Sequence, residues 1–198
     1  MPLPTEAEVR ALVSQVVSGL QEEQDSPATP PSKSASPAAQ PAPGSKLAVA
    51  IGGDHGGYPL KERIGFHLRE LGHEVIDCGT DSGDSVDYPD FAHAVAQRVS
   101  SGAATYGVIV DGAGIGSAMV ANKVPGVRAA LCYDISSARN SREHNHANVL
   151  TLGAGLIGNG LALQILDAWL ATPWAEGRHA RRVDKINDVE RQYLRSAS

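Results

Sequence analysis

From residue 47 onward, short apolar runs alternate with segments whose apolar residues recur at helical spacing. The runs are rich in β-branched residues, and this alternation is typical of parallel strand–helix–strand units. We therefore expect one Rossmann-like α/β domain, a doubly wound, five-stranded parallel sheet between helices in three layers. The expected strands are 47–51, 73–78, 106–110, 127–132 and 147–153, and the expected helices are about 59–71, 91–101, a short one after 111–118, 135–143, 156–170 and 183–194.

The first 45 residues carry a different pattern. A capping box of Thr5 and Glu8 begins a segment with one apolar stripe at helical spacing, and Pro, Ala and Ser then dominate. The first pattern predicts an amphipathic helix and the second an extended linker. The stripe consists of Val9, Leu12, Val13, Val16, Val17 and Leu20. The expected regions are a docking helix (1–25), a linker (26–45) and a globular domain (46–198).

An isolated helix of about 16 residues is marginal in water, so the tethered stripe indicates a partner surface. Its polar face is mainly acidic, with Arg10 as the basic residue, which favours a protein groove over lipid. An expression scar, or a helix that docks back on its own domain, is the alternative. The arrangement resembles the encapsulation peptides that load cargo into bacterial microcompartments, which implies shell proteins as partners of residues 5–21.

Charge and cysteine content exclude several classes of protein. Lys and Arg number 17 against 22 Asp and Glu, without a long basic block, so we expect no nucleic-acid partner. Cys78 and Cys132 lie far apart, which argues against a disulfide framework and a structural zinc. No membrane span or secretory signal is expected, and a cytoplasmic location, inside a microcompartment where the N-terminal resemblance applies, fits best.

Three Gly-rich turns follow expected strands, at 52–57, 111–116 and 153–155. Ligands of doubly wound sheets bind at the carboxyl ends of strands, and glycines let a ligand approach the backbone. The second turn opens a helix, whose free N–H groups can bind an anion. The alternative is a tight turn that needs glycine only sterically. A dinucleotide site fits less well, because Asp54 and His55 interrupt the first turn.

Two polar clusters lie further along. His144 and Asn145 could supply an acid/base and an amide donor, or simply end a helix. Residues 178–182 form a basic cluster that suits a phosphate, although a solvated helix face is the alternative. No Asp or His spacing supports a metal site, so we expect neither metal nor cofactor.

Several ordered motifs carry a family resemblance: GGDHGGYPLKE, DCGT, VDYPDFA, GAGIGSAMVANKVPGVRAALCYD, SREHNHANVLTLG and DAWLATPWAEGRHARRV. Over about residues 46–195 the chain resembles the type B ribose-5-phosphate isomerases and the related galactose-6-phosphate isomerase subunits. The resemblance implies metal-free aldose–ketose isomerisation of a phosphorylated sugar through a cis-enediol. It also implies a homodimer, or a dimer of dimers, with active sites between subunits.

The resemblance assigns roles position by position. His144 matches the ring-opening histidine and Asn145 the amide that stabilises the enediolate. The other matches are the backbone anion hole at Gly112, Ala113, Gly114 and Gly116, the sugar contacts Asp54, Asp87 and Tyr88, and the phosphate ligands His55, Arg178 and Arg182, accompanied by His179.

Three positions depart from the ribose-5-phosphate isomerase pattern of the family. Asp111 stands where the family commonly has its thiol base, Ala113 replaces a hydroxyl residue and Gly155 replaces an arginine. A second subgroup has a carboxylate base at the position of Ser117. Two hypotheses follow: an active isomerase of altered substrate preference with Asp111 as base, or a non-catalytic or heteromeric sugar-phosphate-binding subunit. The first needs Asp111 to be buried, near His144 and free of saturating N–H contacts.

Overall fold

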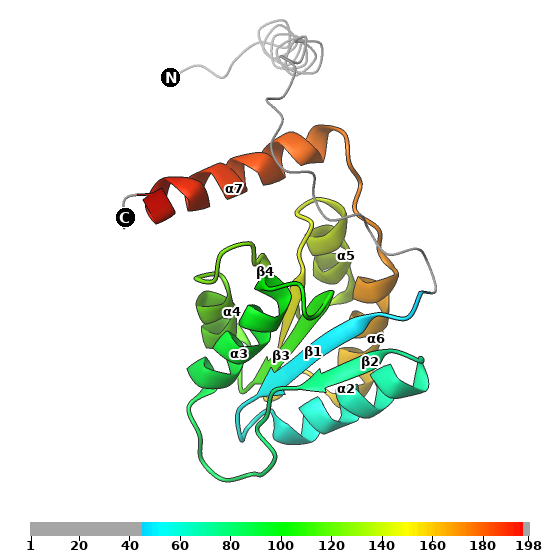
Figure 1. Cartoon of the computed structure of the whole chain (residues 1–198). Coiled ribbons are helices and arrows are strands. Elements are labelled where there is room, and N and C mark those ends of the chain that lie inside the picture. The colour runs from blue at the N-terminus through cyan, green and yellow to red at the C-terminus, as the bar shows by residue number, and fades with distance from the viewer. Residues whose placement is uncertain (1–44, 196–198) are drawn as a thin grey trace, which may run out of the picture. The chain divides into compact units, whose positions relative to one another are not determined.

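The computed structural model describes residues 45–195, so the predicted docking helix and nearly all of the linker lie outside the described residues. Five parallel strands form one sheet in the order β2-β1-β3-β5-β4 (Figure 1), which confirms the predicted Rossmann-like class. The strands are β1 (Ala48–Gly53), β2 (Glu74–Asp77), β3 (Tyr106–Asp111), β4 (Ala129–Leu131) and β5 (Val149–Gly153).

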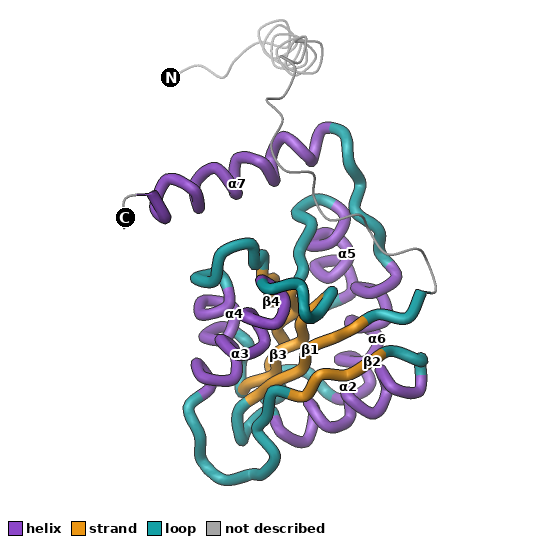
Figure 2. The backbone as a smooth tube through the Cα atoms, in the orientation of Figure 1, coloured by secondary structure: helices purple, strands orange, loops and turns teal. Residues whose placement is uncertain are grey.

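Helices cover both faces of the sheet, and each strand is followed by a helix (Figure 2). Helices α2, α5 and α6 pack on one face, whereas α3 and α4 pack on the other. The helices are α2 (Tyr58–Glu70), α3 (Tyr88–Ser100), α4 (Ile115–Ala121), α5 (Ile135–Glu143), α6 (Asn159–Ala171) and α7 (Arg178–Arg195).

The core explains why the apolar runs become central strands. All six residues of β3 are buried, since helices cover this strand on both sides. Leu60, Ile64 and Leu68 recur every four residues along α2 and form the buried stripe that packs on one face. A strand buried on both faces reads as a continuous apolar run, as the sequence predicted.

Several element boundaries differ from the sequence prediction, among them those of α3, β4 and α7. Helix α3 begins at Tyr88, because Pro89 fits its first turn and Asp87 is extended. Strand β4 is shorter than predicted because, as an edge strand, it pairs only with β5. Helix α7 begins at Arg178, five residues early, directly after Gly177, whose φ is +67°.

The strand register brings the Gly-rich turns together. Gly53 pairs with Val110, and Asp111 pairs with Gly153. All three turns therefore lie at the carboxyl edge of the sheet, where doubly wound proteins bind ligands.

Candidate active site

The first turn fixes Asp54 and His55 above the end of β3. The backbone N–H of Asp54 donates to the carbonyl of Val110 at 3.3 Å, and one Asp54 carboxylate oxygen accepts from the N–H of Gly57 at 2.8 Å. A Cβ on Gly57 would lie 2.0 Å from the Val110 oxygen, so only glycine fits this close approach. The N–H of Val86 donates to His55 Nδ1 at 3.2 Å, which holds the imidazole beside the segment that enters α3.

The second turn is built around the Asp111 carboxylate, which is 5% exposed. Its Oδ1 accepts from the N–H groups of Ala113, at 2.8 Å, and Gly114. Its Oδ2 accepts from the N–H of Ser117 at 3.2 Å and from the Ser117 hydroxyl at 2.5 Å. Gly114 adopts a left-handed φ of +74°, the conformation that points successive N–H groups at the carboxylate.

These contacts contradict the conditions set for Asp111 as the catalytic base. A carboxylate offers about four acceptor positions, and all four are filled by groups of the turn itself. Asp111 is buried, as expected, but it is saturated with hydrogen bonds. The same contacts occupy the N–H groups of Ala113 and Gly114, two donors of the predicted anion hole. In this geometry the Asp111 carboxylate itself is the anion that the turn binds.

Other predicted residues gather around this turn. The Tyr88 ring lies against Gly116, where a Cβ would come within 2.5 Å of it, and this places Asp87 and Tyr88 at the rim. The Tyr133 hydroxyl, which sequence analysis did not single out, donates to the Ala113 carbonyl at 2.5 Å. From the third Gly-rich turn, the N–H of Gly155 donates to the Gly112 carbonyl at 3.0 Å.

His144 and Asn145 lie at the opposite edge of the sheet. They precede β5, whose first residue Val149 pairs with Gly107 near the start of β3. The side chain of Arg142 also reaches the hydroxyl of Tyr106, the first residue of β3. Since a strand rises about 3.3 Å per residue, the length of β3 separates this amino edge from Asp111 by about 16 Å. His144 and Asp111 of one chain therefore do not meet, contrary to the expectation.

The predicted phosphate ligands of the C-terminal region join His144, not the Gly-rich turns. The His144 and His179 rings stack with centroids 4.3 Å apart, and Arg178 Nε lies 3.5 Å from His179 Nε2. Desolvation, together with His144, Arg178 and Arg182, lowers the pKa of His179. Asn140 orients His144 and Asn145. Its Nδ2 lies 2.9 Å from His144 Nδ1, and its Oδ1 accepts from the Asn145 amide at 3.3 Å.

The chain thus carries two half-sites. Figure 1 shows β1 pointing to the lower left, away from α7 at the top. The carboxyl edge holds Asp54, His55, Asp87, Tyr88 and the turn from Gly112 to Gly116, while the amino edge holds His144, Asn145, Arg178, His179 and Arg182. The carboxyl-edge half-site has the carboxylates and the Gly-rich turn, and the amino-edge half-site has the arginines and the His144–Asn145 pair.

Sequence analysis missed the residues that shape the amino-edge turn. The His146 ring stacks on Trp174 with centroids 4.2 Å apart. The His146 backbone has a left-handed φ of +50°. Arg142 is 2% exposed, and it donates to the Ala147 carbonyl while lying over the Tyr106 and Trp169 rings. Most of these contacts join segments that are far apart in the sequence, so a local residue pattern does not predict them.

His146 makes the folded chain sensitive to acid. Desolvation, with the charges of Arg128 and Arg142, lowers its pKa from 6.5 to about 4. As the pH falls, His146 therefore takes up a proton more readily in the unfolded chain than in the folded one. We expect the free energy of unfolding to fall as pH drops from 6.5 towards about 4, by at most about 1.4 kcal/mol per pH unit. Urea unfolding across this range measures the slope. In His146→Asn, which tolerates the positive φ, the slope should be shallower; an unchanged slope would contradict the assignment.

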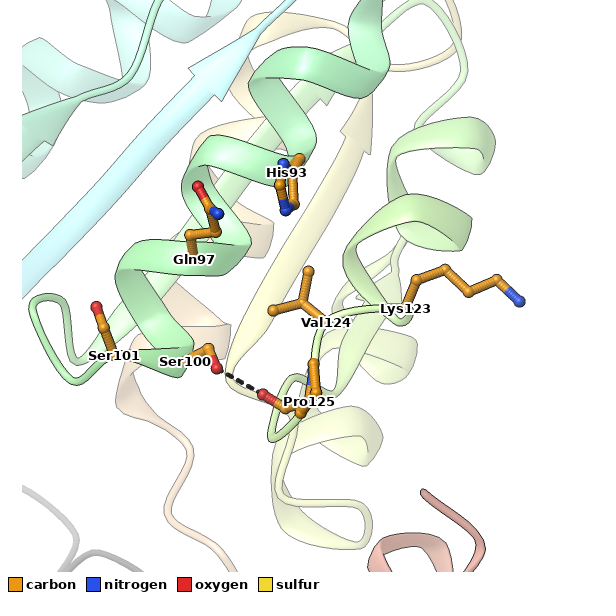
Figure 3. Close-up of a pocket in the computed structure, with 7 residues that line it drawn as sticks. All are labelled: His93, Gln97, Ser100, Ser101, Lys123, Val124 and Pro125. Atoms are coloured by element: carbon orange, nitrogen blue, oxygen red, sulfur yellow. Dashed lines mark hydrogen bonds between the residues drawn. The ribbon is translucent and has the colours of Figure 1, made fainter. Parts of the chain in front are cut away.

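A separate hollow of about 480 Å³ lies between the end of α3 and the segment after α4 (Figure 3). The Ser100 hydroxyl donates to the Pro125 carbonyl across it at 2.7 Å. His93, Gln97, Ser101, Lys123 and Val124 also line it, and none of these is a predicted site residue. Within residues 45–195, no three His, Cys, Asp or Glu side chains are grouped to hold a metal ion, and no helix is long and apolar enough to span a membrane.

A doubly wound α/β domain with a Gly-lined polar edge and an Arg/His cluster defines a class of proteins that bind small polar ligands at strand ends. The model of the ribose/galactose isomerase family matches residues 49–186. The chain belongs to this family.

Individual relatives agree with the family match. Ribose-5-phosphate isomerase B of Escherichia coli is 44% identical, over 73% of this chain and 97% of the relative. The structure of ribose-5-phosphate isomerase B from Clostridium thermocellum is 50% identical, with a TM-score of 0.74 over 74% of this chain and 99% of the other. The Mycoplasma genitalium enzyme, solved with bound ribulose-5-phosphate, is 38% identical, with a TM-score of 0.71 over 73% of this chain and 96% of the other.

Proposed function

We propose that this protein interconverts an aldose phosphate and its ketose, with ribose 5-phosphate and ribulose 5-phosphate as the first pair to test. The observation that carries the proposal is the identity of 44% along nearly the whole length of a ribose-5-phosphate isomerase. The polar groups of both half-sites suit this reaction, because it needs a base, donors for an enediolate, a ring-opening acid/base and a phosphate clamp.

The working site combines two copies of the chain. The carboxyl edge of one copy supplies Asp54, His55 and the Gly-rich turn, and the amino edge of the other supplies His144, Asn145 and the arginines. The separation of these groups within one chain supports this arrangement, as do the exposed apolar residues Ile186, Val189 and Tyr193 of α7, which offer a partner surface. A two-fold dimer would form two such sites.

His55, Arg178 and Arg182 bind the phosphate in this proposal. Arginine presents a planar fork that suits phosphate oxygens, and Arg178 and Arg182 are exposed beside the buried His179. Asn145 and the Gly112 segment face the enediolate, while Asp87 and Tyr88 contact the sugar hydroxyls.

A non-catalytic or heteromeric subunit is the second candidate function. The observation that favours it is the Asp111 carboxylate, which fills the turn that would otherwise bind a substrate anion. Such a subunit would need a homologous partner chain with an open turn.

One assay separates the two candidates. The purified full-length chain is incubated with ribose, allose, galactose or erythrose phosphate in heavy water, and deuterium at C1 or C2 is followed by NMR. Isomerisation through an enediol incorporates solvent deuterium into at least one sugar. If the chain alone shows neither turnover nor exchange, and both appear only when a second homologous chain is added, the heteromeric subunit is favoured.

Residues 1–25 serve as an encapsulation tag for a bacterial microcompartment in the cytoplasm, joined by the linker 26–45. The support is the apolar stripe in the sequence, since residues 1–44 lie outside the described part of the chain. Deleting residues 1–45 should leave turnover and the free energy of unfolding unchanged and abolish co-purification with shell proteins. Loss of folding or turnover would instead make the helix part of the catalytic domain.

A further inference from the structure

We infer that Asp54, a predicted sugar contact, is the base that moves the proton between C1 and C2. The inference rests on the proposed function and names the proton carrier that the sequence left uncertain. It follows from comparing which carboxylates at the carboxyl edge still have an acceptor position to offer.

Asp111 and Ser117 are occupied with each other and with the turn. All acceptor positions of Asp111 are filled, and the Ser117 hydroxyl, 0% exposed, donates to it at 2.5 Å. A proton on Asp111 would displace one of these donors and leave a buried N–H or O–H without an acceptor. Asp111 therefore holds the shape of the turn.

Asp54 has the opposite character. Its Oδ1 is anchored by the Gly57 N–H at 2.8 Å, while its second oxygen has no partner among the contacts of the described residues. The residue is half-buried at the end of β1, which lies beside β3 in the middle of the sheet. A Cβ on Gly56 would lie 3.4 Å from Asp54 Oδ1 and 3.9 Å from the Gly112 nitrogen, so carboxylate and turn face the same space.

Among the other carboxylates of this edge, Asp77 is paired with the Lys61 ammonium at 2.7 Å and Asp134 accepts from the Ser137 N–H at the start of α5. Asp87 is also less suited to the task. It precedes α3 at the rim and is exposed, and its carboxylate does not cap the helix. A hydroxyl contact at the rim fits its position better.

The proton transfer is balanced without any further reagent. From the aldose, the C2–H proton moves to the open Asp54 oxygen, and its electron pair forms the C1=C2 bond while the carbonyl π pair moves to O1. The proton that O2 loses is the one that O1 gains. Asp54 then returns its proton to C1, which leaves the ketose and a carboxylate ready for another cycle.

The test uses Asp54→Asn in the full-length protein. Asparagine keeps an oxygen for the Gly57 N–H and removes only the proton acceptor. We expect kcat to fall about 100-fold to 10,000-fold, with KM changed less than about threefold and deuterium exchange reduced in parallel. A group that only contacts the sugar would mainly raise KM. Formate should raise the turnover of Asp54→Ala at least tenfold, because a small carboxylate can replace the missing base.

Asp84→Asn, an exposed change in the loop before α3, is the matched control and should leave turnover unchanged. An Asp54→Asn enzyme that retains kcat within tenfold of wild type overturns the inference, as does formate rescue of Asp111→Ala in place of Asp54→Ala. A wild-type protein inactive on every sugar phosphate overturns the proposed function together with the inference, so the two failures are distinguishable.

Discussion

Replacing Asp111 by asparagine is expected to lower the free energy of unfolding by about 2–4 kcal/mol. The carboxylate accepts from three backbone N–H groups and the Ser117 hydroxyl inside a buried turn. An amide has one oxygen, so its NH₂ group must face donors of the turn whichever way it is oriented. Buried donors without acceptors cost about 1–3 kcal/mol each, which accounts for the size of the loss.

Urea unfolding of Asp111→Asn measures this effect, with the exposed Asp84→Asn as a control for the lost charge. Ser117→Ala, which removes a single donor, should destabilise the chain less than Asp111→Asn does. The contrary result is an Asp111→Asn protein of normal stability whose kcat has fallen 100-fold or more. That outcome would restore Asp111 as the base.

His144→Asn is expected to lower kcat for ribose 5-phosphate by about 100-fold to 10,000-fold. Imidazole can both give and take a proton near neutral pH, whereas an amide cannot. The His179 stack and the Asn140 contact hold the ring in one orientation, which a proton transfer to a sugar oxygen requires.

A substrate that cannot form a ring separates the ring-opening step from the proton transfer between C1 and C2. A four-carbon aldose 4-phosphate has no free C4 hydroxyl and cannot close a furanose ring. Its isomerisation should therefore suffer much less from His144→Asn than that of ribose 5-phosphate. His93→Asn, an exposed change on α3 outside both half-sites, is the control and should leave both rates unchanged. Equal losses for both substrates would contradict a ring-opening role.

The fold could be predicted because local patterns determine it. Apolar runs such as 106–110 become strands that are buried on both faces, and the spacing between runs leaves room only for crossover helices. The Gly-rich turns fall at the carboxyl edge because all strands are parallel. The family motifs, confirmed by the match over residues 49–186, then define the class of reaction.

The sequence left two roles open for Asp111, a catalytic base or an acceptor of N–H groups within its own turn, and could not decide between them. Its hydrogen bonds depend on the left-handed conformation of Gly114 and the buried position of Ser117, which no residue pattern specifies. The position of His144 was available from topology, since a segment between the end of a helix and the start of a parallel strand lies at the amino edge. It was misplaced because the hypothesis of Asp111 as base required His144 of the same site to lie near it, and the residues were not assigned to separate subunits.

The claim that two copies share each site has a direct test. One chain carries Asp54→Asn and His55→Ala, the other carries His144→Asn, and the two are co-expressed with different affinity tags so that the mixed dimer can be isolated. Each variant alone should be nearly inactive on ribose 5-phosphate. In the mixed dimer one site receives both intact edges, so the account predicts about half of the wild-type kcat per dimer. A mixed dimer as inactive as its parents would contradict the shared site.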